Sequence, residues 1–244
     1  MKSFFQSLSD EEVLSLVRRT ELEQKLLRRH LEEQIIALVP IEESWLEESR
    51  SKFLNGRSQD ECLQEKGWTS ADLELHLRRP EALRRFAHQR FSPGLEERFL
   101  ASQGSRDLVI YSLLRVRDYG LARELWIRLE EDETTFAEAA REFGEGPEAD
   151  RQGVIGPIPI GALQPTLLQD IIRGLKVGEL SAPIALGEWQ LLLRLEKLTP
   201  ARLDDQVRDQ MLQEALDKFL DDRVSRLRNG DGDSLDPFHY DPES

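Results

Sequence analysis

The sequence predicts an α+β protein in which a four-stranded antiparallel sheet with helices is inserted between helical N-terminal and C-terminal segments. Three observations indicate this class. Apolar residues repeat with a helical period through the first hundred residues. The following segment has the order strand, helix, helix, strand, helix, strand, strand, which is typical of a small domain built on an antiparallel sheet. The helical period returns after Ala201.

The N-terminal segment is predicted to be a series of helices joined by short turns. Ser9 with Glu12 fits a capping box, and one long amphipathic helix is expected to run from there to a stop before Pro40. Further helices are expected over residues 42–54, from a cap at Ser58, from a cap at Ser70, over residues 81–91 after a break at Pro80, and near residues 95–100.

The middle segment is predicted to hold the sheet. Strand-length apolar runs lie at residues 107–116, 180–184 and 189–198. Helices are expected over residues 119–131, 135–143 and 166–174, and glycine and proline predict a loop over residues 144–159.

One apolar stripe after Ala201 predicts a long C-terminal helix that packs on the N-terminal helices. The expected domains are an N-terminal helical domain (1–104), a middle domain (105–200), this helix (201–228) and a disordered acidic tail (229–244).

Composition narrows the function. The chain has 244 residues, 39% of them hydrophobic and 33% charged, and a formal net charge of -14. Nucleic acid and anionic membranes are unlikely partners for such a charge. There is no signal peptide pattern and no apolar run of about 18 residues, so we expect a cytoplasmic protein without membrane insertion. Cys62 is the single cysteine, and nucleotide-binding loops are absent, so we expect no metal site and no cofactor.

Three short blocks in the middle segment carry the functional argument. The first is TTFAEAAREFG at residues 134–144, in which Phe-Ala opens a helix. The second is QGVIGP at residues 152–157, a glycine turn into a strand. The third is GELSAPI at residues 178–184. Each block alone is a weak signal, but together they span most of the middle segment in a fixed order.

In this order and spacing the blocks resemble the parvulin-type peptidylprolyl isomerase family, which includes foldases of the SurA type. The resemblance implies a four-stranded sheet with a groove for an unfolded or proline-containing polypeptide. Helices before the domain and one long helix after it also resemble the SurA arrangement, in which the terminal segments form a chaperone body.

The resemblance also assigns the site residues. The family has two histidines on central strands and a nearby cysteine or aspartate. These catalytic positions fall at Ser112 (or its neighbour Tyr111), at Gln190 (or Leu191) and at Gly146, so all three are substituted. All four histidines of the chain lie outside the middle domain. Leu163, Leu168, Trp189 and Tyr111 fall where substrate would be bound, although a leucine at helical spacing is more often a core residue.

Two functions of different class follow. The first is a prolyl isomerase that works weakly, by removing the proline ring from water and by hydrogen bonds that favour a twisted amide over the barrier of about 18–20 kcal/mol. The second is a chaperone or adaptor that binds peptides without catalysis, in maturation or export of a polypeptide. The sequence fixes neither the client nor the oligomeric state.

Overall fold

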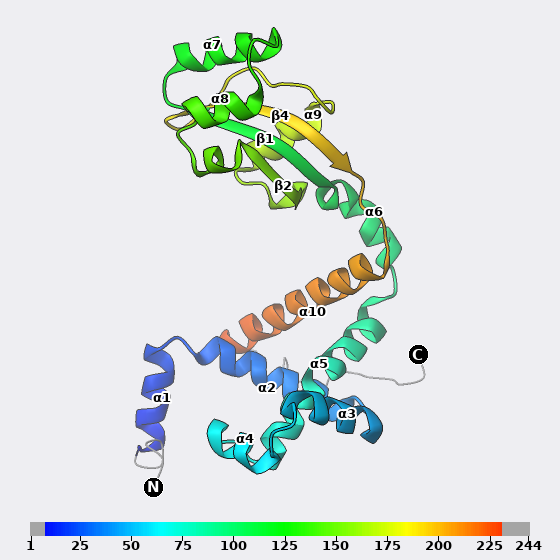
Figure 1. Cartoon of the computed structure of the whole chain (residues 1–244). Coiled ribbons are helices and arrows are strands. Elements are labelled where there is room, and N and C mark those ends of the chain that lie inside the picture. The colour runs from blue at the N-terminus through cyan, green and yellow to red at the C-terminus, as the bar shows by residue number, and fades with distance from the viewer. Residues whose placement is uncertain (1–7, 231–244) are drawn as a thin grey trace. The chain divides into compact units, whose positions relative to one another are not determined.

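A computed structural model of the chain describes residues 8–230 (Figure 1). Contacts divide the chain into two compact units. Unit 1 joins Met1–Leu95 to Asp204–Ser244, and unit 2 is Glu96–Leu203. The predicted α+β class, with a four-stranded antiparallel sheet between helical segments, is confirmed. The predicted acidic tail (229–244) lies outside the described residues, except for Asn229 and Gly230.

Unit 1 is helical. Its elements are α1 (Asp10–Arg19), α2 (Glu23–Leu38), α3 (Glu43–Leu54), α4 (Gln59–Lys66), α5 (Ser70–Phe91) and α10 (Asp205–Arg228). The capping box at Ser9 and Glu12 is present, and Ser58 caps α4 by accepting a hydrogen bond from the Glu61 N–H. Within this unit α10 packs against α2 and α5.

The prediction of one long N-terminal helix was wrong. The chain breaks between α1 and α2, where Glu21 has the left-handed φ of 56°. The Thr20 hydroxyl donates to the Leu16 and Val17 carbonyls, which satisfies acceptors at the end of α1. The apolar period alone did not reveal this break, because it continues across it.

The predicted break at Pro80 was also wrong, since α5 continues through this residue. A proline removes one backbone hydrogen bond from a helix. Packing of α5 against α2, α3 and α10 outweighs that loss. The cap of α5 is Thr69 and not Ser70: Thr69 forms a capping box with Asp72.

The core of unit 1 contains a buried carboxylate. Glu32 on α2 is 1% exposed. Its oxygens lie 2.7 Å from Arg79 Nε on α5 and 3.3 Å from Arg28 Nε, and Arg28 also bonds Asp217 and Asp221 on α10. One acidic side chain therefore links the three central helices through arginines, which have several donors each.

Unit 2 is built on a sheet of strand order β2-β1-β4-β3. Its elements are α6 (Leu95–Arg106, whose first residue belongs to unit 1), β1 (Leu108–Val116), α7 (Tyr119–Glu130), α8 (Phe136–Phe143), η2 (Pro147–Arg151), β2 (Val154–Pro159), η3 (Ile160–Ala162), α9 (Thr166–Gly174), β3 (Ile184–Leu186) and β4 (Trp189–Thr199). Helix α6 is longer than the predicted helix near residues 95–100. The segment 144–159 is not only a loop, because it also forms η2 and β2.

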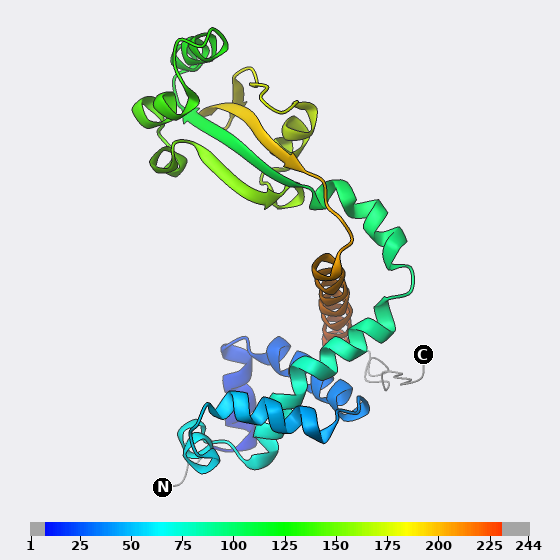
Figure 2. The same ribbon diagram turned by 45° about the vertical axis from the view of Figure 1, so that its right-hand side comes forward.

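Helices lie on both sides of the sheet (Figure 2), and the sheet separates two apolar layers. On one face, Leu114, Val116 and Leu192 pack against residues of α7 and α8. On the other, Tyr111, Leu113 and Leu191 pack with residues of η3 and α9 and the loop between them. We call this second surface the α9 face. Because alternate strand residues point to opposite sides, the parity of a residue in β1 or β4 decides which layer it joins.

The motif blocks have local structural roles. Gly153 has φ 81°, and a Cβ there would lie 2.9 Å from the Leu113 carbonyl oxygen, so only glycine fits the turn into β2. In the third block, Ser181 donates its N–H to the Leu193 carbonyl, and its hydroxyl accepts from the Leu193 N–H. This block thus extends the pairing of β4 beyond β3.

Among residues 8–230, no helix combines the length and the apolar character needed to cross a lipid bilayer.

Replacing Glu32 tests the linkage in unit 1. Glu32→Ala leaves Arg28, Arg79 and also Arg29, which lies 3.6 Å from Glu32, without their shared carboxylate. We expect the free energy of unfolding to fall by about 2–4 kcal/mol. Glu33→Ala is the matched control. Its side chain is 41% exposed and pairs only with Arg29, so its loss should stay below about 0.5 kcal/mol. Urea unfolding followed by NMR signals of α2 and α5 measures both, and equal losses would contradict the assigned role of Glu32.

Candidate functional site on the α9 face

Four residues of the predicted site come together on the α9 face. Tyr111 of β1, Leu163 after η3 and Leu168 of α9 belong to one buried cluster, against which Trp189 of β4 packs. The exposed fractions of Tyr111, Leu163 and Leu168 are 4%, 3% and 6%. These three side chains therefore form core, and Trp189, which is half-buried, lies at the edge of the cluster.

Ser112 and Gln190 lie on the opposite side of the sheet. Ser112 pairs in register with Arg194, and the Arg194 guanidinium lies over the Phe136 ring of α8. The Ser112 hydroxyl donates a hydrogen bond to Glu196 at 2.5 Å. Gln190 pairs with Val116, which belongs to the α7 and α8 layer. The neighbours Tyr111 and Leu191 face α9 instead. Of the alternatives that the sequence left open, only these neighbours share a surface with Leu163 and Leu168.

Gly146 lies beneath an ion pair. Arg115 of β1 binds Glu148 of η2 through two hydrogen bonds, Nε to Oε1 at 2.7 Å and Nη2 to Oε2 at 2.8 Å. A Cβ on Gly146 would lie 2.2 Å from Glu148 Oε1 and 2.4 Å from Arg115 Nε. The ion pair therefore occupies the space into which any side chain at position 146 would project.

Burial and geometry both stabilise this ion pair. The Glu148 side chain is 4% exposed and accepts both bonds in the planar geometry that suits guanidinium and carboxylate. Arg115 pairs with Leu191 across the β1–β4 ladder. Breaking a buried pair leaves an uncompensated charge, which is strongly unfavourable.

A second arginine covers Trp189. The guanidinium of Arg117 lies 4.5 Å from the Trp189 ring centre, a cation–π distance, and that of Arg115 lies at 6.0 Å. Arg117 also bonds Glu145 at 3.0 Å and lies 3.4 Å from Glu188. These contacts join the segment after α8 to the turn between β3 and β4.

Burial raises the pKa of the Tyr111 phenol above its ordinary value, and the nearby Glu148 carboxylate raises it further, while Arg115 opposes the shift. Tyr111 is therefore a neutral hydroxyl at physiological pH. It is unsuited to accept a proton from a substrate.

Sequence reasoning missed Arg115, Glu148 and Arg117. Arg115 did give a signal, since it is a charged residue inside the apolar run DLVIYSLLRV. A charge in such a strand requires a partner, and Glu148 follows Gly146 by only two residues. Neither residue belongs to the motif blocks, so neither was considered.

The α9 face can still make apolar contacts. Several half-buried side chains surround the buried cluster: Ile155, Ile158, Ile171, Leu175, Ile184, Leu186 and Trp189. Leu167 on α9 is 44% exposed. We call these eight residues the apolar rim. It leaves partly exposed apolar surface beside the Arg115–Glu148 pair.

The family comparison supports the resemblance found in the motifs. Residues 117–197 match the family model described as rotamase, PPIC-type PPIASE domain. This match covers the three motif blocks and β4 up to Lys197. Comparison with curated proteins found no match.

Solved structures similar to this chain include the peptidylprolyl isomerase PrsA from Bacillus cereus. It has 16% identity and a TM-score of 0.51, with 97% of this chain and 91% of that chain covered. PrsA from Bacillus anthracis has 15% identity and a TM-score of 0.47, covering 89% and 100%. A structure from a study of the SurA-like chaperones PEB4 and Cj1289 of Campylobacter jejuni has 14% identity and a TM-score of 0.39, covering 97% and 89%. At this identity the Bacillus cereus structure establishes a shared fold.

Substitution of Gly146 tests the position of the ion pair. Gly146→Ala forces Arg115 and Glu148 apart, and we expect the free energy of unfolding of unit 2 to fall by about 1–3 kcal/mol. Gly174→Ala, at a site with open space around the added methyl, should change it by less than about 0.5 kcal/mol. Urea unfolding followed by NMR signals of β1 measures both.

The same substitution in an Arg115→Met, Glu148→Leu background tests whether the loss of stability comes from a clash with the ion pair. If Gly146→Ala costs as much there as in the native chain, the clash lies elsewhere and the assignment is wrong.

The raised pKa of Tyr111 predicts a dependence of stability on pH. The folded chain keeps the phenol proton where the unfolded chain loses it, so this contribution is full below the unfolded pKa of about 10 and is lost as pH rises through the folded value. The free energy of unfolding should therefore decline above about pH 10. Tyr111→Phe should remove this part of the decline, while Tyr119→Phe, at a side chain 58% exposed, should leave it in place.

Proposed function

We propose that this protein, whose residues 117–197 form a parvulin-type domain, is a folding factor that binds unfolded or proline-containing polypeptides and has little or no prolyl isomerase activity. The observation that carries the proposal is the Arg115–Glu148 pair over Gly146, at the position that the family resemblance assigns to a cysteine or aspartate.

Catalysis of Xaa-Pro rotation needs groups that favour the twisted amide over the planar one. The resemblance assigns the two histidine positions to Ser112 or Tyr111 and to Gln190 or Leu191. Of these, Tyr111 and Leu191 lie on the α9 face, where they supply a buried neutral phenol and an aliphatic side chain. Arg115 and Glu148 satisfy each other. The Tyr111 hydroxyl remains a hydrogen-bond donor, but its side chain is only 4% exposed, so it is poorly accessible to a substrate amide.

Peptide binding without catalysis requires apolar contact but no polar groups directed at the amide. Exposed and half-buried apolar side chains gain free energy when a guest covers them, at about 25 cal/mol per Å². The apolar rim provides such side chains around the buried cluster. The cytoplasmic location expected from the sequence belongs to the same proposal.

An isomerase assay tests the catalytic half. With an unstructured peptide that contains one Leu-Pro bond, we expect no acceleration over spontaneous isomerisation, which takes tens to hundreds of seconds at 25 °C. NMR exchange between the cis and trans signals at high protein concentration measures the rate. Acceleration that scales with protein concentration would replace the proposal with that of a weak isomerase.

Matched substitutions on opposite faces test the binding half. Leu167 on α9 and Ile127 on α7 are aliphatic helix residues exposed to 44% and 40%. Leu167→Ser should weaken binding of the same peptide about fivefold, which corresponds to roughly 1 kcal/mol of lost apolar contact. Ile127→Ser should leave the affinity unchanged. Equal effects, or no binding by the native chain, would exclude the α9 face as the binding surface.

A further inference from the structure

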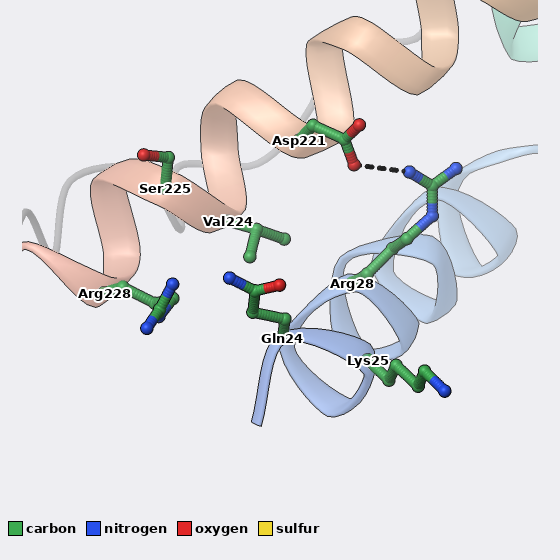
Figure 3. A pocket seen from close by; sticks show the side chains of 7 residues that line it. All are labelled: Gln24, Lys25, Arg28, Asp221, Val224, Ser225 and Arg228. Carbon is green, nitrogen blue, oxygen red and sulfur yellow. Dashed lines mark hydrogen bonds and ion pairs between the residues drawn. The ribbon is translucent and has the colours of Figure 1, made fainter. Parts of the chain in front are cut away.

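A pocket in unit 1 lies between the beginning of α2 and the end of α10, away from any residue used in the proposed function. Its volume is about 340 Å³, and it is lined by Gln24, Lys25, Arg28, Asp221, Val224, Ser225 and Arg228. In Figure 3, Gln24 and Arg228 point toward each other at one side, and Arg28 bonds Asp221 at the other. Three cations and one anion therefore line it.

The cations differ in how far they are already neutralised. Arg28 bonds Asp217 and Asp221 and lies 3.3 Å from Glu32. Arg228 reaches only Glu23, at 3.9 Å, and Lys25 has no ion pair within residues 8–230. Both are exposed. Lys25 and Arg228 thus keep donors for an added anion.

The end of α10 does not repel such an anion as a bare helix end would. The carboxyl end of a helix carries partial negative charge, but Arg226 and Arg228 stand in the last turn of α10 and offset it. The pocket is therefore locally basic on a chain whose net charge is -14.

The occupant that fits is the segment that follows α10. Residues 231–244 contain five acidic residues, Asp231, Asp233, Asp236, Asp241 and Glu243, and no lysine or arginine. The segment starts three residues after Arg228, and Gly230 has the left-handed φ of 85°, a conformation that turns the chain away from the helix axis. An extended residue spans about 3.3–3.6 Å, so Asp231, Asp233 and Asp236 are within reach of Lys25 and Arg228.

We propose that the acidic segment 231–236 binds this pocket of its own chain through ion pairs with Lys25 and Arg228. Exposed ion pairs are individually weak. Attachment to α10 compensates, because a short tether gives the carboxylates a millimolar effective concentration at the pocket. The proposal is independent of peptide binding on the α9 face.

A spin label tests the proposal in the full chain. The label is attached to Ser234→Cys in a Cys62→Ala background, because Cys62 is the chain's one natural thiol. We expect paramagnetic broadening of the amide signals of residues 24–28 and 224–228 at low salt. It should fall at least fivefold at about 0.5 M NaCl, where charges are screened within a few ångströms.

Charge variants provide the controls. Neutralising the segment (Asp231→Asn, Asp233→Asn, Asp236→Asn) should abolish the broadening, and so should Lys25→Glu with Arg228→Glu. Broadening that persists in these variants, or is absent from the native sequence at low salt, would overturn the proposal. A mixture of spin-labelled chains and isotope-labelled chains without spin label tests whether the segment binds a second copy instead. Broadening that appears only between chains would mean binding to a second copy and would also refute the proposal.

Discussion

The antiparallel pairing of β1 with β4 is the constraint on which unit 2 depends. These strands lie more than 70 residues apart in sequence, and their register from Tyr111 to Val116 is continuous. Both faces of the pair are covered, by α7 and α8 on one side and α9 on the other. A slip of one residue would exchange the two layers, so the register is strongly determined. It also decides which side chains share a surface, and it places Tyr111, Arg115 and Leu191 on the α9 face.

On that face, an ion pair fills the space at Gly146, the position that the family resemblance assigns to a cysteine or aspartate. Arg115 projects from β1 and Glu148 from η2, and their two hydrogen bonds fill the space above Gly146. A buried carboxylate needs such a partner, because leaving water costs more than an unpaired charge can recover. The glycine, the arginine and the glutamate therefore form one structural unit. Together they stabilise the loop before β2.

Unit 1 uses the same physical device between helices. Glu32 is buried beside Arg79 and Arg28, and Arg28 also binds Asp217 and Asp221 of α10. Exposed ion pairs of this kind contribute little, but a buried carboxylate shared by several donors is costly to break. The donors of Arg28 are therefore occupied by these carboxylates, whereas Lys25 and Arg228, which line the pocket between α2 and α10, keep donors for a further anion. The difference between satisfied and unsatisfied cations distinguishes the core of the helical unit from its pocket.

The sequence by itself determined the fold class, most helix and strand positions, and the parvulin resemblance, because periodicity, caps and glycine turns are local properties. Two predictions were wrong. The helix α5 continues through Pro80 because tertiary packing overrides local preference, and the chain breaks at Glu21 although the apolar period continues across it. The sequence also narrowed the site to pairs of neighbours, Ser112 or Tyr111 and Gln190 or Leu191. Only the tertiary structure showed that the members of each pair lie on opposite faces of the sheet, and only it brought Arg115 and Glu148, 33 residues apart, together over Gly146.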